Sequence, residues 1–308
     1  MLPRLLVSVA GIFVATVLAA DVAYVTCQNG NVLSVIDLET GDQQRWPLPG
    51  QPAGIAVSGS GIFVVSPETK EVRRLDPRSG TELARVRLNG GPNGVTVDQM
   101  RQRVFVSDWY NARIWVLRAE DLSVIGELET GAAPAGLALS PDGRYLASAD
   151  RDADQVSIFD AETFAFVARH AVGTRPFGLA FSQDGRLFVG NVGSDDMSVL
   201  EPLQGLLTTV AVGARPYAVT FAADRVFVSN QYEDSVSVLN LNTLETITKI
   251  DVGEYPEGLD VTPDGASVLV ANWFDNTVSR IDVSALKVVA QWETGDGPRA
   301  FGAFILAD

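Results

Sequence analysis

The stretch VGTRPFGLAF at residues 172–181 returns forty residues later as VGARPYAVTF at residues 212–221. Related phrases, each centred on a proline, recur along the whole chain at spacings of 40 to 42 residues. These prolines are Pro52, Pro92, Pro134, Pro176, Pro216, Pro256 and Pro298. Seven copies at a regular period indicate a repeat architecture. A period of this length with strand-forming residues throughout is typical of β-propeller blades.

Each repeat contains four short apolar runs that are separated by turn residues. In the unit 133–173 the runs are GLALS, RYLASA, VSIFD and FAFVARHAV, and the first two are joined by SPDG. Proline and glycine in SPDG set the backbone angles of a tight turn, and Val, Ile, Leu and Phe favour strands. We therefore expect an all-β fold with four antiparallel strands in each blade.

The first strand of each unit carries a small residue two positions after the proline. A larger side chain there would meet a neighbouring backbone where the blades crowd around the central axis. We therefore expect this position to lie at the axis in every blade. The residues concerned are Gly54, Gly94, Gly136, Gly178, Ala218 and Gly258.

The two ends of the chain together complete one blade. Residues 22–48 match a second, third and fourth strand without a first, and residues 300–305 match a first strand without successors. We expect a seven-bladed β-propeller whose last blade takes its inner strand from the C-terminus and its outer three strands from the N-terminus. This closure removes an exposed sheet edge, and it brings Phe304 near Val25.

The first twenty residues differ in kind from the rest. MLPR carries one positive charge and is followed by the uncharged run LLVSVAGIFVATVL and small residues. This order is typical of a secretory signal peptide, and the run is short for a membrane span of about 20 residues. We expect a signal peptide over 1–20 and a single propeller domain over 21–308. The protein is then periplasmic or secreted and has no stable membrane anchor after cleavage. The alternative is an N-terminal membrane anchor.

Composition limits the chemistry that the chain can perform. A formal net charge of −15 argues against binding to nucleic acid or anionic membranes, because both need a basic face. One cysteine, Cys27, excludes an internal disulfide, and one histidine, His170, leaves zinc sites and Ser-His-Asp catalysis without enough residues. We expect no cofactor and no metal. The alternating carboxylates in 150–154 leave open whether the acidic loops bind calcium.

Two segments resemble a known family. YVTCQNGNVLSVIDLETG at 24–41 and FVSNQYEDSVSVLNLNTLETITKIDVG at 227–253 are similar to the YVTN-repeat family of seven-bladed β-propellers. The resemblance covers about the whole chain after its first twenty residues. It implies the fold, but the shared residues are strand, turn and packing residues that carry no activity. Related propellers include heavy chains of quinoprotein amine dehydrogenases and lactonase-like proteins.

Alternating strand directions place two sets of loops on one face, which we call the top face. These are the loops before the first strands and the loops between the second and third strands. Such loops usually carry function, aromatic residues are enriched in interface cores, and arginine binds carboxylate and phosphate. Our candidate binding residues are Asn93, Trp109, Tyr110, Arg175, Phe177, Arg215, Tyr217, Tyr232, Glu257, Trp273 and Arg299. Gln231, Tyr255 and Phe274 belong to the same loops.

Together these features predict an exported monomer that acts as a binding or assembly module without catalysis of its own. Its partner is expected to be a protein that the top face contacts. The resemblance to amine dehydrogenase heavy chains implies an exported redox enzyme as one kind of partner. The alternative is a lactonase-like hydrolase, or another enzyme that uses carboxylates in the channel.

Overall fold

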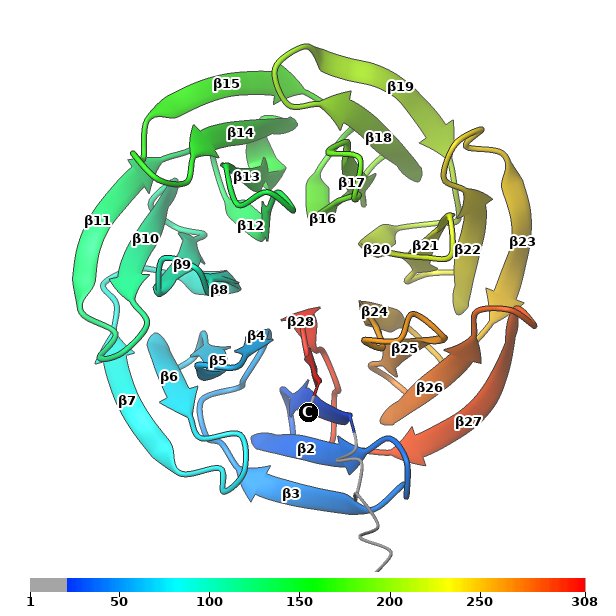
Figure 1. Cartoon of the computed structure of the whole chain (residues 1–308), viewed down its shortest axis with the longest axis horizontal. Helices are drawn as coiled ribbons and strands as arrows, with labels where there is room; N and C mark the ends of the chain where they lie inside the picture. Colours follow the sequence, from blue (N-terminus) through cyan, green and yellow to red (C-terminus); the bar gives the residue numbers. More distant parts are fainter. Residues whose placement is uncertain (1–20, 308) are drawn as a thin grey trace, which may run out of the picture.

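The computed structural model describes residues 21–307, which form a ring of seven sheets whose first strands surround a common axis (Figure 1). The predicted signal segment, 1–20, lies outside the described residues. Within the described part the only helix is a single 3-10 turn, η1 (Arg151–Ala153), and no helix there could span a membrane. The predicted all-β, seven-bladed fold is confirmed.

We number the blades from the N-terminus. Blade 1 contains β1 (Val22–Cys27), β2 (Val32–Asp37), β3 (Gln43–Pro47) and β29 (Ile305–Leu306). Blade 2 contains β4 (Gly54–Ser58), β5 (Gly61–Ser66), β6 (Glu71–Leu75) and β7 (Glu82–Arg87). Blade 3 contains β8 (Pro92–Asp98), β9 (Arg103–Asp108), β10 (Arg113–Arg118) and β11 (Val124–Glu129). Blade 4 contains β12 (Pro134–Leu139), β13 (Tyr145–Asp150), β14 (Gln155–Asp160) and β15 (Phe166–Ala171).

The remaining blades repeat the same order from the axis outward. Blade 5 contains β16 (Pro176–Phe181), β17 (Leu187–Asn191), β18 (Asp196–Glu201) and β19 (Gly205–Ala211). Blade 6 contains β20 (Pro216–Ala222), β21 (Arg225–Asn230), β22 (Ser235–Asn240) and β23 (Thr246–Asp251). Blade 7 contains β24 (Pro256–Val261), β25 (Ser267–Asn272), β26 (Thr277–Asp282) and β27 (Lys287–Glu293).

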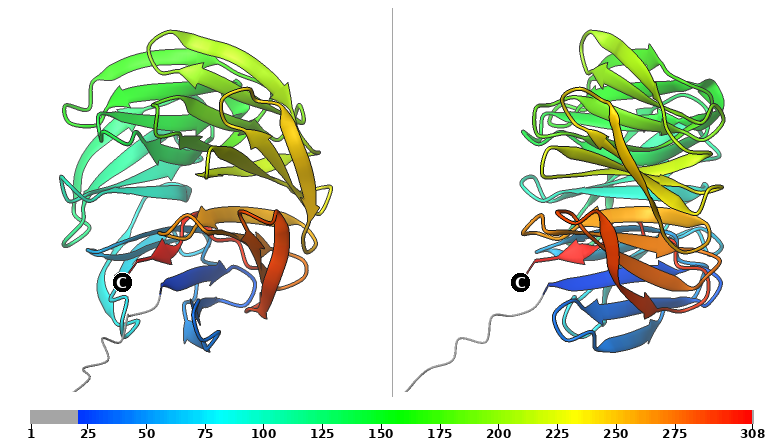
Figure 2. Two further views of the ribbon diagram at one scale, coloured as in Figure 1. Left: turned by 45° about the vertical axis from the view of Figure 1, so that its right-hand side comes forward. Right: turned by 90° about the vertical axis from the view of Figure 1, so that its right-hand side faces the viewer.

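The chain ends close the ring as expected, with one difference in detail. Strand β29 pairs antiparallel with β1, and the Tyr24 amide donates to the Phe304 carbonyl at 2.8 Å. The preceding strand, β28 (Phe301–Ala303), instead pairs in parallel with β4 of blade 2. Figure 2 shows β1 and the C-terminal end side by side. The C-terminal inner strand therefore joins blade 1 to blade 2 as well as completing blade 1.

A carboxylate explains how the C-terminal strand serves two blades. One oxygen of Asp260 accepts the amide hydrogens of Phe304 and Ile305, at 2.7 and 2.8 Å. Phe304 lies between β28 and β29, and Ile305 is the first residue of β29, so both amides lie where the chain passes from one sheet to the other. Their hydrogen-bonding needs are met by Asp260 instead of by a strand partner.

The predicted crowding at the axis is confirmed. A Cβ added to Gly54 would lie 2.2 Å from the Asn93 carbonyl oxygen, and one added to Gly178 would lie 2.1 Å from that of Tyr217. In both cases the obstacle is the backbone of the next blade. Glycine therefore allows neighbouring first strands to approach closely around the channel.

Adjacent blades are sealed near the rim by one large side chain per joint. In four of the seven joints this side chain comes from the turn between the third and fourth strands of the later blade, at a residue with positive φ. Leu122, Phe164, Leu244 and Leu286 occupy this turn position and pack into four of the joints. Holding a residue other than glycine at positive φ costs about 1 kcal/mol, which the buried apolar area offsets.

Glycine occupies the same turn position in the other three joints, and there the large side chain comes from the earlier blade. Trp46 lies against Gly80, His170 against Gly205 and Trp292 against Gly41. All three large residues occupy the same place on their fourth strands, opposite the second residue of the third strand. The only histidine is therefore a packing residue, and its Nε2 lies 2.8 Å from the Pro202 carbonyl.

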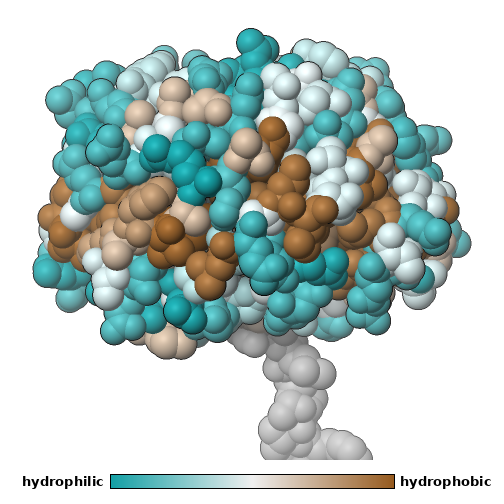
Figure 3. Space-filling view, turned by 90° about the horizontal axis from the view of Figure 1, so that it is seen from above, coloured by the Kyte–Doolittle hydropathy of each residue, from teal (hydrophilic) through white to brown (hydrophobic). Residues whose placement is uncertain are grey.

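The fourth strands form the outer wall of the ring. Figure 3 views this wall from the side of β15 and β19, where a hydrophobic band runs between more polar upper and lower edges. Phe166, Leu206 and Leu207 are exposed on these two strands. The inner three strands of each blade are mostly buried, as expected for sheets that are covered on both faces.

Candidate functional site

The top face begins at the proline phrases, where the backbone adopts an unusual conformation. The residue before the proline has positive φ at six of the seven positions, which are Gln51, Ala133, Arg175, Arg215, Tyr255 and Gly297. The repeated phrase is thus primarily architecture, because it reverses the chain before each first strand.

An acidic residue of the preceding blade holds several of these turns. The amide of Arg175 donates to Asp154 at 2.7 Å, and the amide of Tyr255 donates to Asp234 at 2.9 Å. Asp195 accepts the amide of Arg215 in the same way, at 2.8 Å. The acidic loops therefore connect one blade to the next through hydrogen bonds. Within residues 21–307 no group of three potential metal ligands is found.

The residue after each proline faces the mouth of the channel on the top face. Four of these residues, Phe177, Tyr217, Glu257 and Arg299, come together there. One part of this group is apolar. The ring centroids of Phe177 and Tyr217 are 4.5 Å apart, and Phe301 lies 5.0 Å from Phe177. These three buried rings form a plug at the mouth.

A polar network lies directly beside the plug. The Arg299 guanidinium donates to the Tyr217 hydroxyl at 2.6 Å, and its Nε lies 3.2 Å from Oε2 of Glu257. Gln231 donates to Oε1 of Glu257 at 2.7 Å and accepts a hydrogen bond from Arg215. The network thus joins two arginines to one carboxylate through residues of three blades.

Burial controls the charges in this network. It raises the pKa of Glu257, and the Arg299 guanidinium opposes that shift. Burial also raises the pKa of Tyr217 far above the range of an ordinary phenol, so this hydroxyl stays neutral. For Arg299, burial disfavours the charge, but Glu257 and Tyr217 outweigh it and raise the pKa of the guanidinium. The mouth therefore holds a charged guanidinium, that of Arg299, beside the carboxyl group of Glu257, and the positive charge of the first favours the charged form of the second.

Four aromatic residues of blades 6 and 7 form a continuous surface cluster, here called the aromatic strip. Tyr232 and Tyr255 are 5.6 Å apart between ring centroids, and Tyr255 lies 4.8 Å from Phe274 and 5.8 Å from Trp273. Tyr232 is 61% exposed and Phe274 is 58% exposed. The Arg215 guanidinium lies over the Tyr232 ring at 4.9 Å, which connects the strip to the polar network.

The structure brings most of the predicted residues together but separates three of them. Phe177, Tyr217, Glu257 and Arg299 meet in the mouth, whereas Tyr232 and Trp273 belong to the strip and Arg215 bridges the two groups. Trp109 joins the plug, 6.1 Å from Phe177. Tyr110 is exposed against Gly91, and Arg175 and Asn93 make no side-chain hydrogen bond to the network among the described residues.

Two mouth residues escaped the sequence analysis. Gln28 accepts a hydrogen bond from Arg299 at 2.9 Å, and Phe301 completes the plug. Gln28 occupies in blade 1 the place that Gln231 has in blade 6, so an alignment of the blades could have found it. In the last phrase Ala300 replaces the glycine of the Pro-x-Gly pattern, and Phe301 follows it. No feature of the repeat marks Phe301.

Comparisons with known proteins identify the family. The sequence profile of the YNCE-like beta-propeller family matches residues 108–307. The chain belongs to this family. This agrees with the resemblance to YVTN-repeat propellers. A comparison with curated protein sequences gives no match.

Solved structures share the fold of this YNCE-like propeller at low sequence identity. A functionally unknown protein from Desulfotomaculum acetoxidans is 16% identical with a TM-score of 0.79, covering 92% of this chain and 98% of that one. Hydrazine synthase from Kuenenia stuttgartiensis is 16% identical with a TM-score of 0.74, covering 85% and 91%. An inactive virginiamycin B lyase from Staphylococcus aureus with quinupristin is 16% identical with a TM-score of 0.70, covering 83% and 93%. At this identity the likeness establishes the fold alone.

Proposed function

We propose that this propeller is an exported binding module whose top face captures a protein partner. The observation that carries the proposal is the aromatic strip, which leaves Tyr232 and Phe274 more than half exposed on scaffolded loops. Aromatic residues of this kind supply much of the binding energy when a partner buries them. The nearby Arg215 adds a cation that can reach a carboxylate at the edge of the contact.

The polar network supports a binding role better than a catalytic one. Oε1 of Glu257 accepts a hydrogen bond from Gln231, while Oε2 is buried 3.2 Å from Nε of Arg299 and accepts no hydrogen bond; the ion pair holds this carboxyl group in place. Asp260, which lines the channel below the mouth, accepts backbone amides that hold the C-terminal strand. Both channel carboxylates thus serve the structure, and we assign the lactonase-like alternative the second place.

The kind of partner follows from the fold and the expected export. The resemblance described above includes the heavy chains of quinoprotein amine dehydrogenases, and one of the solved structures with this fold is a hydrazine synthase. We therefore propose an exported redox protein as the first class of partner to test. This step rests on analogy of fold.

Partner capture by a double variant of the strip tests the proposal. We expect Tyr232→Ser with Phe274→Ser to lose most of the protein captured from a periplasmic extract, because two exposed anchors are removed. The matched control is Phe166→Ser, since Phe166 is 55% exposed but lies on the outer strand β15. Capture that is reduced equally by both variants, or by neither, would contradict a role for the top face.

A further inference from the structure

The three loops that carry the aromatic strip contain four acidic residues and no basic one. They span 231–234 between β21 and β22, 252–255 before β24, and 273–276 between β25 and β26. The acidic residues are all exposed, and they are Glu233, Asp234, Glu254 and Asp275. The aromatic strip is therefore a surface of rings flanked by negative charge.

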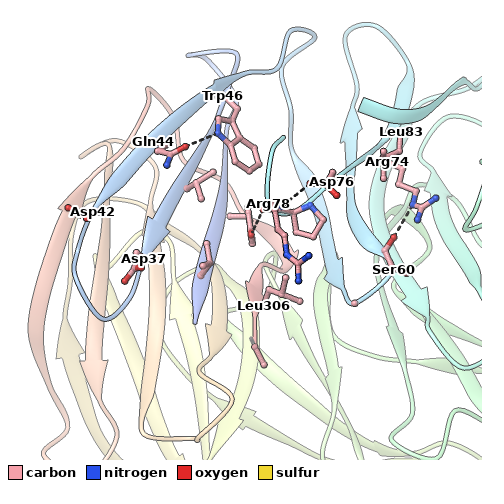
Figure 4. A pocket seen from close by; sticks show the side chains of 16 residues that line it. Asp37, Asp42, Gln44, Trp46, Ser60, Arg74, Asp76, Arg78, Leu83 and Leu306 are labelled. Carbon is pink, nitrogen blue, oxygen red and sulfur yellow. Dashed lines mark hydrogen bonds between the residues drawn. The ribbon is translucent and has the colours of Figure 1, made fainter. Parts of the chain in front are cut away.

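A groove of about 750 Å³ between blades 1 and 2 differs from the aromatic strip because its charges are mixed. Asp37, Asp42 and Asp76 line this groove together with Arg74 and Arg78 (Figure 4). Charges of both signs in one lining partly cancel, so the groove has no strong preference for the sign of a ligand. The loops of the aromatic strip carry one sign only, and this favours a cationic group.

Three of the four carboxylates in these loops have a partner within the fold. Asp234 and Asp275 accept backbone amides, and Glu233 forms an ion pair with Lys249. Glu254 differs from them, since within residues 21–307 its carboxylate has no hydrogen bond or ion pair. One negative charge of the aromatic strip is therefore available to a partner.

This free carboxylate belongs to a residue at the exposed end of the aromatic strip. The backbone carbonyl of Glu254 accepts the amide hydrogen of Phe274 at 3.2 Å, and Tyr255 follows Glu254 in the chain. The ring of Phe274 is 58% exposed. A partner that covers this ring must therefore also approach the charge of Glu254.

The other end of the aromatic strip already holds a cation of the chain itself. The Arg215 guanidinium lies over the Tyr232 ring, 4.9 Å from its centroid. Among the residues from 21 to 307, no arginine or lysine lies over the rings of Tyr255, Trp273 or Phe274. The face of an aromatic ring attracts a cation through its quadrupole, so the rings at the Phe274 end can accept a cation from outside.

We propose that the Phe274 end of the aromatic strip receives a lysine or arginine side chain from a basic surface of the partner protein. This inference rests on the proposed function, because it names the charge of the partner that the top face captures. The cation packs against the rings of Tyr255 and Phe274, and the carboxylate of Glu254 pairs with it. The formal net charge of −15 attracts such a partner from a distance and repels an acidic one.

Two labelled peptides test the preferred charge by fluorescence anisotropy with the whole protein. One alternates lysine with glycine, and the other alternates glutamate with glycine. The titrations are made at low ionic strength, where attraction between exposed charges is screened least. We expect the lysine peptide to bind at least about tenfold tighter than the glutamate peptide. Equal affinity for the two peptides, or binding of neither, overturns the inference.

A pair of matched variants separates a local contact from the overall charge of the protein. Glu254→Gln should weaken the lysine peptide about twofold to fivefold, as expected when one exposed ion pair is lost. Glu120→Gln changes the net charge by the same amount at an exposed position between β10 and β11, and should leave the affinity unchanged. An equal effect of the two variants would show that only the net charge matters and would overturn the site.

A second pair tests the contribution of the ring. Phe274→Leu keeps an apolar side chain but removes the ring, and it should weaken the lysine peptide about twofold to fivefold. Phe166→Leu makes the same change at a residue that is 55% exposed on β15, and should have no effect. Unchanged binding in Phe274→Leu would contradict a contact between the cation and the ring.

The peptide titrations and the capture experiment with Tyr232→Ser and Phe274→Ser can fail separately. Loss of capture in that double variant, without a preference for the lysine peptide, retains the proposed function and overturns the basic partner. A preference for the lysine peptide that depends on Glu254, together with unchanged capture, supports cation recognition by the aromatic strip and contradicts the proposed function.

Discussion

The two ends of the channel differ in chemistry although the same repeat builds both. At the top mouth the residues after the prolines range from alanine to phenylalanine, glutamate and arginine, and they form a plug and a polar network. Below, the channel is lined mainly by small and aliphatic residues of the first strands, with Asp260 as its one acidic lining residue among those described. The repeat thus keeps the backbone constant and concentrates its variation on one face, where a partner can be recognised.

The largest effect is expected at the top mouth, when Glu257 is removed. Glu257→Ala should lower the free energy of unfolding by about 3 kcal/mol, because it leaves Arg299 without its carboxylate in a mostly buried site. Glu257→Gln keeps the shape and the contact with Gln231 and should cost about half as much. Urea unfolding at neutral pH measures both. A loss below about 1 kcal/mol for Glu257→Ala would show that the network contributes little.

A smaller effect tests the crowding that both ends of the channel share. Gly136→Ala places a Cβ 2.5 Å from the Phe177 carbonyl oxygen and should lower the free energy of unfolding by about 2 kcal/mol. Gly126→Ala on the outer strand β11 is the matched control, since the nearest atom to its added Cβ, Cε2 of Phe164, is 3.6 Å away. Thermal melting compares the two. Equal melting temperatures would contradict the close approach of the first strands.

At the lower part of the channel we predict a dependence on pH. Burial raises the pKa of Asp260 to about 6, against the backbone amides that favour its charged form. A carboxyl group whose pKa is raised on folding adds stability at low pH, and this contribution is lost as pH rises from about 4 through about 6. From pH 7 to pH 4, wild type should therefore gain about 1 to 3 kcal/mol relative to Asp260→Asn.

Urea unfolding of both proteins across this pH range measures the difference. A difference that stays constant over the range would show that Asp260 titrates normally. Destabilisation of Asp260→Asn at all pH values, beyond the pH-dependent part, reports the clamp on Phe304 and Ile305.

Much of the fold could be predicted from the sequence because the repeat is local and regular. The proline spacing fixed the number of blades, and the mismatched ends at 22–48 and 300–305 indicated how the ring closes. The split of the C-terminal strand could not be foreseen, since it depends on Asp260, whose side chain meets Phe304 only in the closed ring.

Most residues of the candidate site could be predicted from the sequence, but their contacts with one another could not. Arg175, before its proline, is exposed and Tyr217, after its proline, is buried, but the repeat alone does not show which of the buried side chains contact one another. The hydrogen bonds that Asp154 and Asp234 accept from the next blade could not be predicted either, because they depend on how neighbouring blades are placed in the ring.

The most direct test of the proposed function is site-specific photo-crosslinking in living cells. A benzophenone amino acid in place of Tyr232 samples the aromatic strip, and the same amino acid in place of Phe166 samples the outer wall at similar exposure. We predict a discrete crosslinked protein species from position 232 and none from position 166. No species from position 232, or the same species from both positions, would contradict recognition by the top face.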